Sequence, residues 1–440
     1  MLACGHDGPP CPERVCTHLR DADDKLPKFL HWYTGIERER ELLCIACIQA
    51  RESGERVPMV ALCPSCHTKI GHLGSAEGVR GRPGFRIREE PFPVSIVEHA
   101  FPRDLGSIID AVPIQAAPGC WLLLGEDGRL TRFDGAQSSY ITLAASLRPD
   151  MGSSWRRTPR RRLHVSPRGD AAAVVVDYGR SGEVFDLRSG SMIRALDGGN
   201  YHCDTVPFSL AFVEVDGQTL LIHRSAWNRL DLVNCDSGLL LSNRSFPGKG
   251  EPGFEEHHLD YFHGALFPSP SGRKIVDDGW VWHPVGIPRA WSIDAWLGNV
   301  WESEDGPTGR DLCQREYCWD HPMTWIDESS FAVGGLGDDD ILLIPGVRIF
   351  DLRLAPGMRS HPERWLEAPE VGSFVGPEGN LFSDGIHLFA AAPDGLTRWD
   401  PVDGARTGTI NGFNPSRFHS GSRDFTELRQ DTLVCCRLAH

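Results

Sequence analysis

The sequence predicts a mainly β fold: a β-propeller of seven blades, within a range of six to eight, that carries a small N-terminal zinc-binding module. Three observations predict it. Half of the 14 cysteines lie within the first 66 residues, short β-rich runs separated by turns follow from about residue 93, and one turn motif recurs along those runs. We therefore expect a zinc-binding module at 1–70, a linker at 71–92 and the propeller at 93–440.

The cysteines of the first part form short pairs with metal-ligand spacing. Two C-x-H pairs precede two C-x-x-C pairs, and together they supply two closed tetrahedral sites of three cysteines and one histidine each. In a reducing compartment such a cluster indicates metal binding rather than disulfides. The expected ligands of the two zinc ions are Cys4, His6, Cys16, His18, Cys44, Cys47, Cys63 and Cys66.

The grouping of these ligands is open, because the pairs can be nested or crossed and Cys11 and His67 can each replace one ligand. The stretch resembles the treble-clef, zinc-ribbon and cross-brace fingers, which implies structural zinc. Its order of pairs departs from that of RING-type fingers, so the resemblance implies no ligase activity. Between the second and third pairs, Phe29, Trp32 and Tyr33 are expected to form the core of the module rather than a binding face.

The linker at 71–92 is rich in Gly, Arg and Glu and shows no apolar periodicity. After it, an apolar residue is repeatedly followed by Asp or Asn, a turn and a glycine, at intervals of about 48 to 60 residues. Such intervals suit four-stranded blades. The copies are Phe133-Asp134, Phe185-Asp186, Val233-Asn234, Ile293-Asp294, Phe350-Asp351 and Trp399-Asp400.

Six copies and a C-terminal remnant predict the seven blades. The remnant at 423–438 supplies two strands at most, and residues 93–100 are expected to add the outer strand that closes the ring. Pro-x-Gly turns recur ahead of several strands, beginning at Ser166, Ser269 and Ala392.

In repeat length, strand pattern and these turns, residues 93–440 resemble the WD40-like propellers, although only Trp399-Asp400 shows the Trp-Asp dipeptide. The resemblance implies a rigid disc that binds partners on a face or in its central channel. An array of β-sandwiches is the competing fold.

A histidine-rich stretch is a candidate second metal or acid–base site, formed by His257, His258, Asp260 and His263. We favour the alternative, a solvated loop with one buried histidine.

An arginine run is a candidate anion-binding patch, formed by Arg156, Arg157, Arg160, Arg161 and Arg162. Here the favoured alternative is a solvated loop between blades.

No P-loop, dinucleotide fingerprint, G-x-S-x-G or H-E-x-x-H motif occurs, so no catalytic residue is predicted. Because propeller enzymes gather their sites from several blades, enzymatic activity stays open. The net charge of −15 argues against broad binding to nucleic acid or anionic lipid. With no export signal and no membrane-length apolar run, we expect a cytoplasmic protein.

The leading hypothesis is a non-catalytic scaffold that recognises a protein partner. One alternative is a propeller enzyme with a central-channel site that a metal could assist. The other is a nucleic-acid-binding protein that uses the zinc module and the arginine run at 156–162.

Overall fold

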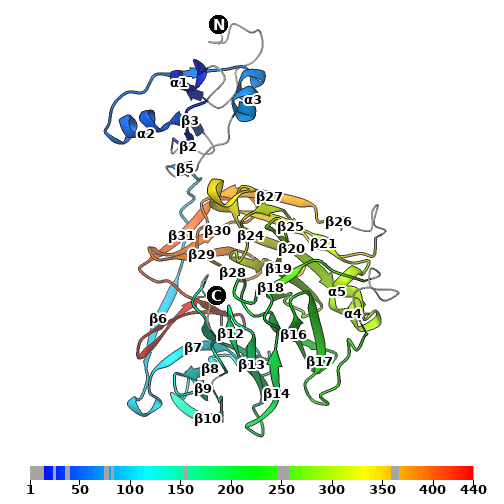
Figure 1. Ribbon diagram of the computed structural model, residues 1–440. Coiled ribbons are helices and arrows are strands. Elements are labelled where there is room, and N and C mark those ends of the chain that lie inside the picture. Colours follow the sequence, from blue (N-terminus) through cyan, green and yellow to red (C-terminus); the bar gives the residue numbers. More distant parts are fainter. Residues whose placement is uncertain are drawn as a thin grey trace.

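The computed structural model describes residues 14–22, 26–34, 40–73, 79–80, 84–147, 149–152, 157–245, 257–357 and 366–439. Strands dominate these residues, which confirms the mainly β prediction. One sheet belongs to the N-terminal part, and seven further sheets follow from Val94 (Figure 1). None of the helices in these ranges is long and apolar enough to cross a membrane.

The N-terminal part forms a five-stranded sheet in the order β4-β1-β3-β2-β5, with helices that follow three of its strands. Its small core contains residues of both the sheet and the helices, among them Phe29, Leu43 and Ile48. The elements are β1 (Arg14–Cys16), α1 (Thr17–Arg20), β2 (Phe29–Tyr33), β3 (Arg40–Cys44), α2 (Ile45–Glu52), β4 (Met59–Ala61), α3 (Pro64–Leu73) and β5 (Val79–Arg80).

The seven remaining sheets are built mainly from antiparallel hairpins that follow one another along the chain. We number them from the one that begins at Ile108. The first sheet holds β7 (Ile108–Pro113), β8 (Cys120–Gly125), β9 (Arg129–Asp134) and β10 (Ser139–Ala145). The second holds β11 (Arg160–Val165), β12 (Ala171–Asp177), β13 (Ser181–Asp186) and β14 (Ser191–Asp197), and the third holds β15 (Leu210–Val215), β16 (Gln218–Ala226) and β17 (Arg229–Asn234).

The fourth sheet departs from four strands because short additional strands extend its edge. It contains β18 (Phe262–Pro268), β19 (Lys274–Val281), β20 (Val285–Ser292), β21 (Arg310–Asp311), β22 (Arg315–Glu316) and β26 (Leu366–Glu367), and α4 (Ile293–Gly298) and α5 (Glu302–Asp305) follow β20. The fifth holds β23 (Met323–Trp325), β24 (Ser330–Leu336), β25 (Ile344–Asp351) and β27 (Glu370–Val375). The sixth holds β28 (Asn380–Ser383), β29 (Leu388–Ala392), β30 (Gly395–Trp399) and β31 (Arg406–Asn411), and the seventh holds β32 (Arg417–His419), β33 (Asp424–Arg429), β34 (Thr432–Leu438) and β6 (Val94–Ala100).

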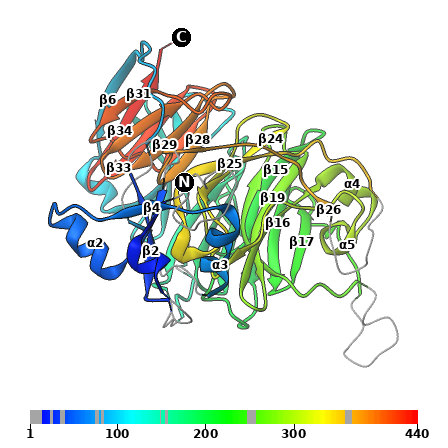
Figure 2. The ribbon, with the colours of Figure 1, turned by 90° about the horizontal axis from the view of Figure 1, so that it is seen from above.

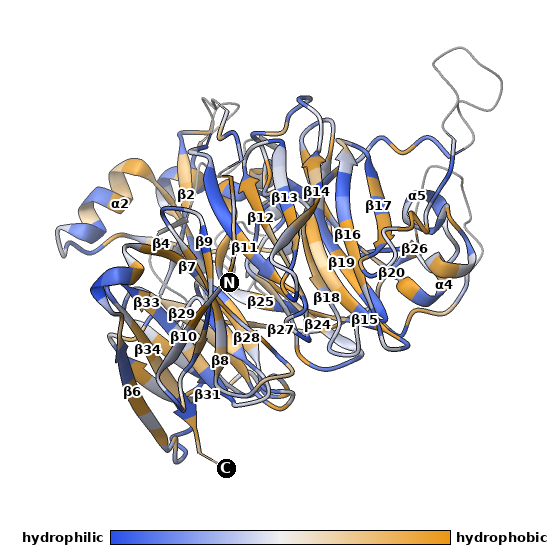
Figure 3. Cartoon of the chain, turned by 90° about the horizontal axis from the view of Figure 1, so that it is seen from below, coloured by the Kyte–Doolittle hydropathy of each residue, from blue (hydrophilic) through white to orange (hydrophobic). Residues whose placement is uncertain are grey.

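Hydrophobic cores join each sheet to the next, and the last core joins the seventh sheet to the first. For example, Leu122 and Val174 share the core between the first two sheets, and Trp121 and Leu433 share the core that closes the ring. A strand between two such cores is buried on both faces, so β12 (AAAVVVD) is buried along its whole length instead of alternating. The strands carry most of the hydrophobic residues, and the turns are mainly hydrophilic (Figure 3). The seven sheets, joined into a closed ring by these shared cores, are arranged as in a propeller.

The recurring sequence motif marks the end of the third strand in five of these sheets. Its Asp or Asn accepts hydrogen bonds from backbone N–H groups of the following turn, as Asp134 does from Ala136 and Gln137 at 2.9 and 3.1 Å. In the fourth sheet, Ile293-Asp294 instead lies at the start of α4. The motif therefore works through local turn chemistry.

The first and last strands of the ring, β6 and β34, are neighbours in the seventh sheet. β6 pairs with β34 from Val94↔Leu438 to Ala100↔Thr432, which confirms the expected closing strand. The remnant at 423–438 supplies two strands, β33 and β34, as expected, and the short strand β32 just before it was not predicted. This strand has only three residues, which is too short for a periodic signal.

The module and the residues after it pack against the ring (Figures 1 and 2). Tyr33 is buried against Ile344 and Val375 of the fifth sheet, whereas Phe29 and Trp32 belong to the core of the module as expected. Residues 84–92, part of the expected linker, run beside β31. There, Arg88 donates its backbone N–H to the Arg406 carbonyl at 2.9 Å.

Candidate metal centre and channel mouth

Four of the expected zinc ligands come together in the N-terminal module. The ligand atoms of Cys16, His18, Cys44 and Cys47 all lie within 4.8 Å of one another. Cys16 ends β1 and Cys44 ends β3, and these two strands are parallel neighbours, so their C-terminal ends lie side by side. The helix that follows each strand then places His18 or Cys47 within its first turn. The C-x-H pair therefore spans a strand–helix junction.

The hydrogen bonds and burial of this cluster suit a metal site. The His18 Nδ1 lies 3.1 Å from the Cys47 Sγ and 3.7 Å from the Cys44 Sγ, and the Cys44 backbone N–H donates to the Cys16 Sγ at 3.4 Å. Burial raises the pKa of the Cys47 thiol to about 12, and it also raises the pKa of Cys16. Crowded, buried thiols ionise readily only when a cation compensates their charge.

The donor set of three sulfurs and one imidazole nitrogen is one that zinc binds in closed structural sites. The residues therefore fit a metal ion, and the second C-x-H pair shares this cluster with the first C-x-x-C pair. That grouping is the nested one and excludes a cross-brace, in which alternate pairs would meet.

The other four expected ligands are placed only in part. Cys63 precedes α3 and Cys66 lies in its first turn, which repeats the strand–helix junction of Cys44 and Cys47. Cys4 and His6, with the substitute Cys11, lie outside the described residues. The other substitute, His67, follows Cys66 on α3.

A second site is a cavity of about 440 Å³ where the seven sheets meet, which we call the channel mouth. The first strands of neighbouring sheets contact each other around the ring. Except in the fourth sheet, where Ala265 and Phe267 of β18 contribute, the cavity is lined at or near the N-terminal ends of these strands, so it opens at one end of the central channel. The residues of its lining used below are Asp110, Arg160, Arg161, Arg162, Asp320, His321 and Arg417.

The arginine run lies on this lining. A solvated loop was the favoured interpretation of the run, but Arg160, Arg161 and Arg162 begin the innermost strand β11. Leu163 and Val165 pack into the core between the first two sheets, so the strand is anchored beyond the arginines. Of the rest of the run, Arg156 lies outside the described residues and Arg157 lies at an adjoining pocket.

Carboxylates compensate most of these charges. Arg160 and Arg162 share the buried Asp177 at 3.4 and 3.5 Å, and Arg417 pairs with Asp110 at 3.0 Å.

Arg161 differs from the other lining arginines. It donates its Nη2 to the Glu126 carbonyl at 2.9 Å, and its buried Nη1 has no hydrogen-bond partner among the described residues. No carboxylate of those residues pairs with it, so Arg161 adds an uncompensated positive charge to the mouth.

A contact between distant sheets involves Asp320 of the same lining. Tyr178 of the second sheet donates its hydroxyl to Asp320, which leads into the fifth sheet, at 2.5 Å. Arg157 and Arg160 lie over the Tyr178 ring at 5.5 and 5.9 Å. Tyr178 and Asp320 both have positive φ, 58° and 62°. Backbone strain of this kind collects at functional sites, because the surrounding structure must hold it in place.

A cysteine and a histidine near the mouth form no activated nucleophile. The Cys318 Sγ lies 3.8 Å from the His321 Nδ1. Burial raises the pKa of Cys318 to about 11 and lowers that of His321 to about 4, so both groups stay neutral near pH 7. A thiolate–imidazolium pair needs shifts in the opposite directions.

The histidine-rich stretch does not form one site. His257 contacts Asp305 at 2.7 Å, and the buried His263 contacts Asp277 at 2.6 Å. His258 and Asp260 instead line another pocket. Within the described ranges, no group of three or more candidate metal ligands forms besides the cysteine cluster of the module.

That other pocket consists largely of aromatic residues that the sequence analysis did not single out. It has a volume of about 410 Å³ and is lined by Tyr201, Trp227, His258, Asp260, Phe262 and Trp282. The Trp280-Val281-Trp282 spacing at the end of β19 is a sequence signal that could have indicated it.

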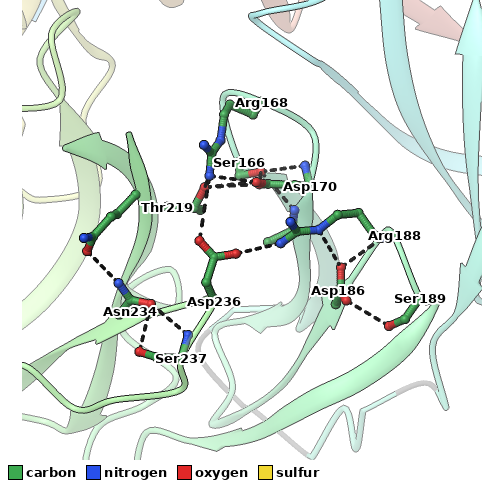
Figure 4. Close-up of polar contacts among 12 residues, drawn as sticks. Ser166, Arg168, Asp170, Asp186, Arg188, Ser189, Thr219, Asn234, Asp236 and Ser237 are labelled. Carbon is green, nitrogen blue, oxygen red and sulfur yellow. Dashed lines mark hydrogen bonds and ion pairs between the residues drawn. The ribbon is translucent and has the colours of Figure 1, made fainter. Parts of the chain in front are cut away.

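At the opposite end of the ring, polar contacts between turns join the second and third sheets. Arg168, in the turn after β11, donates to the Gly217 carbonyl at 2.8 Å and pairs with Glu214 at 3.2 Å. Arg188 pairs with Asp236 at 2.6 Å and Arg168 lies 4.0 Å from the same carboxylate, so two arginines of the second sheet hold Asp236 of the third (Figure 4). This saturated network has a structural role.

Comparisons with known proteins add little to this picture. No protein-family model matches the sequence. No curated protein matches it either. Among solved structures, the chain is similar to the Myceliophteria thermophila Cps50 (Swd1) β-propeller domain, with a TM-score of 0.47 and 12% identity over 79% of this chain and 100% of that chain. The propeller arrangement described above rests on the sheets and cores of this chain alone.

Proposed function

We propose that this protein is a non-catalytic interaction scaffold that binds an acidic segment of a protein partner at the channel mouth. Each of the seven sheets counts as one blade in this proposal. The observation that carries it is the placement of Arg161. A guanidinium on the wall of a cavity that pairs with no carboxylate of the described residues is suited to an incoming carboxylate.

The charges around the mouth support an acidic ligand. Four arginines line the mouth against three nearby carboxylates, in a chain whose net charge is −15. Arginine forms paired hydrogen bonds with carboxylates, and a partly enclosed cavity reduces the screening of such contacts. The negative charge on the rest of the protein repels an acidic partner, whereas the local excess of positive charge at the mouth attracts it. An acidic partner is therefore oriented with its charged segment toward the mouth.

Binding of a labelled octaglutamate peptide, measured by fluorescence anisotropy at low and moderate salt, tests the proposal. We expect Arg161→Gln to weaken binding by about tenfold, because a charge-assisted hydrogen bond contributes about 1.5 to 3 kcal/mol. Arg353→Gln, at a side chain that is 78% exposed in a turn, is the matched control and should bind as the wild type does. Equal binding of octaglutamine would contradict the proposal, and tighter binding of an oligothymidylate would favour the nucleic-acid alternative.

We propose further that the module binds zinc and that it has two ions. Cys63 and Cys66 would hold the second ion with Cys4 and His6, which completes the nested grouping. The chain segments of the module share only a small core, and bound zinc would fix four of these segments in place. The surface of the module is then left for contact with the ring. Metal content by mass spectrometry should show about two zinc ions per chain, and one ion would contradict the second site.

A cluster of cysteines with metal-ligand geometry, such as Cys16, Cys44 and Cys47, supports a reducing compartment, and we propose the cytoplasm. The proposed parts stay the module at 1–70, the linker at 71–92 and the propeller at 93–440.

A further inference from the structure

The pocket lined by Tyr201, Trp227, Phe262 and Trp282, which we call the aromatic pocket, lies outside the channel mouth. Phe262 and Trp280 are buried and stack at 4.1 Å, and they form a floor. Tyr201 and Trp282 are 54% and 50% exposed, so each ring keeps a face open to solvent. Exposure of large apolar rings to water is unfavourable, and a ligand that covers the exposed ring faces removes this cost.

The rings contact one another closely. The Trp227 ring lies 4.5 Å from the Phe262 ring, and the Tyr201 ring lies 5.5 Å from Trp227 and 5.7 Å from Phe262. Trp282 approaches the same Phe262 at 6.1 Å. Phe262 is therefore the common neighbour of three rings that line one cavity, which is a built arrangement rather than a chance exposure of single aromatics.

The backbone beside two of these rings is strained. Tyr201 is followed by His202 with φ of 50°, and Trp282 is followed by His283 with φ of 115°. Neither position is a glycine, so the surrounding structure must hold each backbone in this strained conformation. The His202 ring packs between the two walls, at 4.6 Å from Tyr201 and 5.1 Å from Trp282. The packing that maintains the strained backbone thus also keeps both walls in place.

The charge of the lining selects the ligand. Asp260 is exposed and forms no hydrogen bond or ion pair with any residue that the structure describes, and neither Lys nor Arg lines the pocket. Ring faces and a carboxylate both attract a cation and repel an anion. A strongly hydrated ammonium would lose much of its hydration among the rings, whereas methyl groups replace that hydration by apolar contact. An alkylated ammonium satisfies all of these conditions.

We infer that the aromatic pocket binds the trimethylated side chain of a lysine in a protein partner, with Asp260 as its counter-ion. This site goes beyond the channel-mouth proposal and does not depend on it. The volume of about 410 Å³ exceeds that of one trimethylammonium group, so the methylene stem enters as well.

Isothermal titration calorimetry of the full chain with Nα-acetyl-trimethyllysine methylamide tests the inference. Three other ligands are titrated for comparison: the unmethylated lysine derivative, the uncharged isostere in which carbon replaces the ammonium nitrogen, and choline. We expect the trimethyllysine probe to bind at least about tenfold more tightly than the first two, because cation–π attraction requires the charge and the methyl groups limit its desolvation cost. Choline, which lacks the stem, should bind more weakly than the probe.

Two variants locate the binding. Trp282→Ala should lower the affinity by about tenfold and Asp260→Asn by about threefold. Because both side chains are exposed, their loss should leave the fold intact, which circular dichroism verifies. Asp216→Asn, an exposed carboxylate at the other end of the ring, is the control and should bind normally. Equal binding of the carbon isostere, no binding of the probe, or tighter binding of choline would each overturn the inference.

Discussion

Asp278 makes the stability of the fourth sheet dependent on pH. It is 1% exposed on β19, and its Oδ2 accepts the His321 backbone N–H at 2.8 Å. The Oδ1 has no hydrogen-bond partner among the described residues. Burial, with the neighbouring carboxylates of Asp320 and Asp277, raises its pKa from 3.8 to about 8, although Arg315 opposes the shift.

The sign follows from proton binding. Between the unfolded pKa near 4 and the folded pKa near 8, the folded protein keeps a proton that the unfolded chain has lost. The free energy of unfolding therefore falls with rising pH, by about 1.4 kcal/mol per pH unit, or about 3 kcal/mol from pH 5 to pH 7. The stabilisation is fully present below the unfolded pKa and is lost as the pH rises through the folded pKa.

Asp278→Asn replaces the protonated carboxyl by a group of the same shape that does not ionise. Its amide oxygen can still accept the His321 N–H. We expect the variant to match the wild type near pH 4 and to become progressively more stable than it up to pH 8, by an amount on the order of 5 kcal/mol. The difference between the two proteins cancels the titration of all other groups.

Urea unfolding at each pH, followed by tryptophan fluorescence, measures this difference. Asp338→Asn, at a side chain that is 79% exposed, should give a curve parallel to that of the wild type. If the curve of Asp278→Asn also runs parallel to the wild type from pH 5 to pH 8, Asp278 is ionised throughout and the reasoning from burial is refuted.

Three other substitutions give clear expectations. Cys44→Ala should remove about one metal ion per chain in mass spectrometry, and unchanged content would contradict the cluster. Tyr33→Ala should lower the free energy of unfolding by about 2 to 4 kcal/mol in urea, because it leaves a cavity between module and ring; a loss under about 0.5 kcal/mol would show that the contact contributes little. Gly169→Ala should cost about 2 to 4 kcal/mol in the same assay, since φ is 72° and the new Cβ would lie 2.6 Å from the Ile114 Cγ2, whereas Gly217→Ala, at φ 77° with open space, should cost about 1 kcal/mol. Equal costs would contradict the steric argument.

Much of the fold was predictable because its signals are local. The Asp or Asn that ends a third strand bonds the turn beside it, so the repeat survives in sequence even where Trp-Asp is lost. The Pro-x-Gly turns at Ser166 and Ser269 likewise join the first and second strands of their sheets. The copy at Ala392 joins a second and a third strand, which shows that the motif marks hairpins rather than one fixed position.

The site was less predictable because its contacts join distant parts of the chain. The arginines of β11 suggested a loop, since an innermost strand exposes its channel end to water and loses the apolar signal there. Leu163 and Val165, two residues apart, were the remaining indication of a strand. Nothing local indicates the bond between Tyr178 and Asp320 across the mouth, or the parallel pairing of β1 and β3 that selects the nested ligands.

The pairing of β6 with β34 also sets an order of events in the making of the protein. Ala100 and Thr432 are partners across more than 300 residues, so a ribosome must reach Leu438 before all strands of the last sheet are available. The other sheets consist mainly of neighbouring hairpins and can fold while synthesis continues. Closing so large a loop is slow in entropic terms, although its cost grows only with the logarithm of length. Until then the first sheet exposes the apolar face that contains Trp121 and Phe133. The incomplete ring is therefore prone to nonspecific association until its final strand pairs.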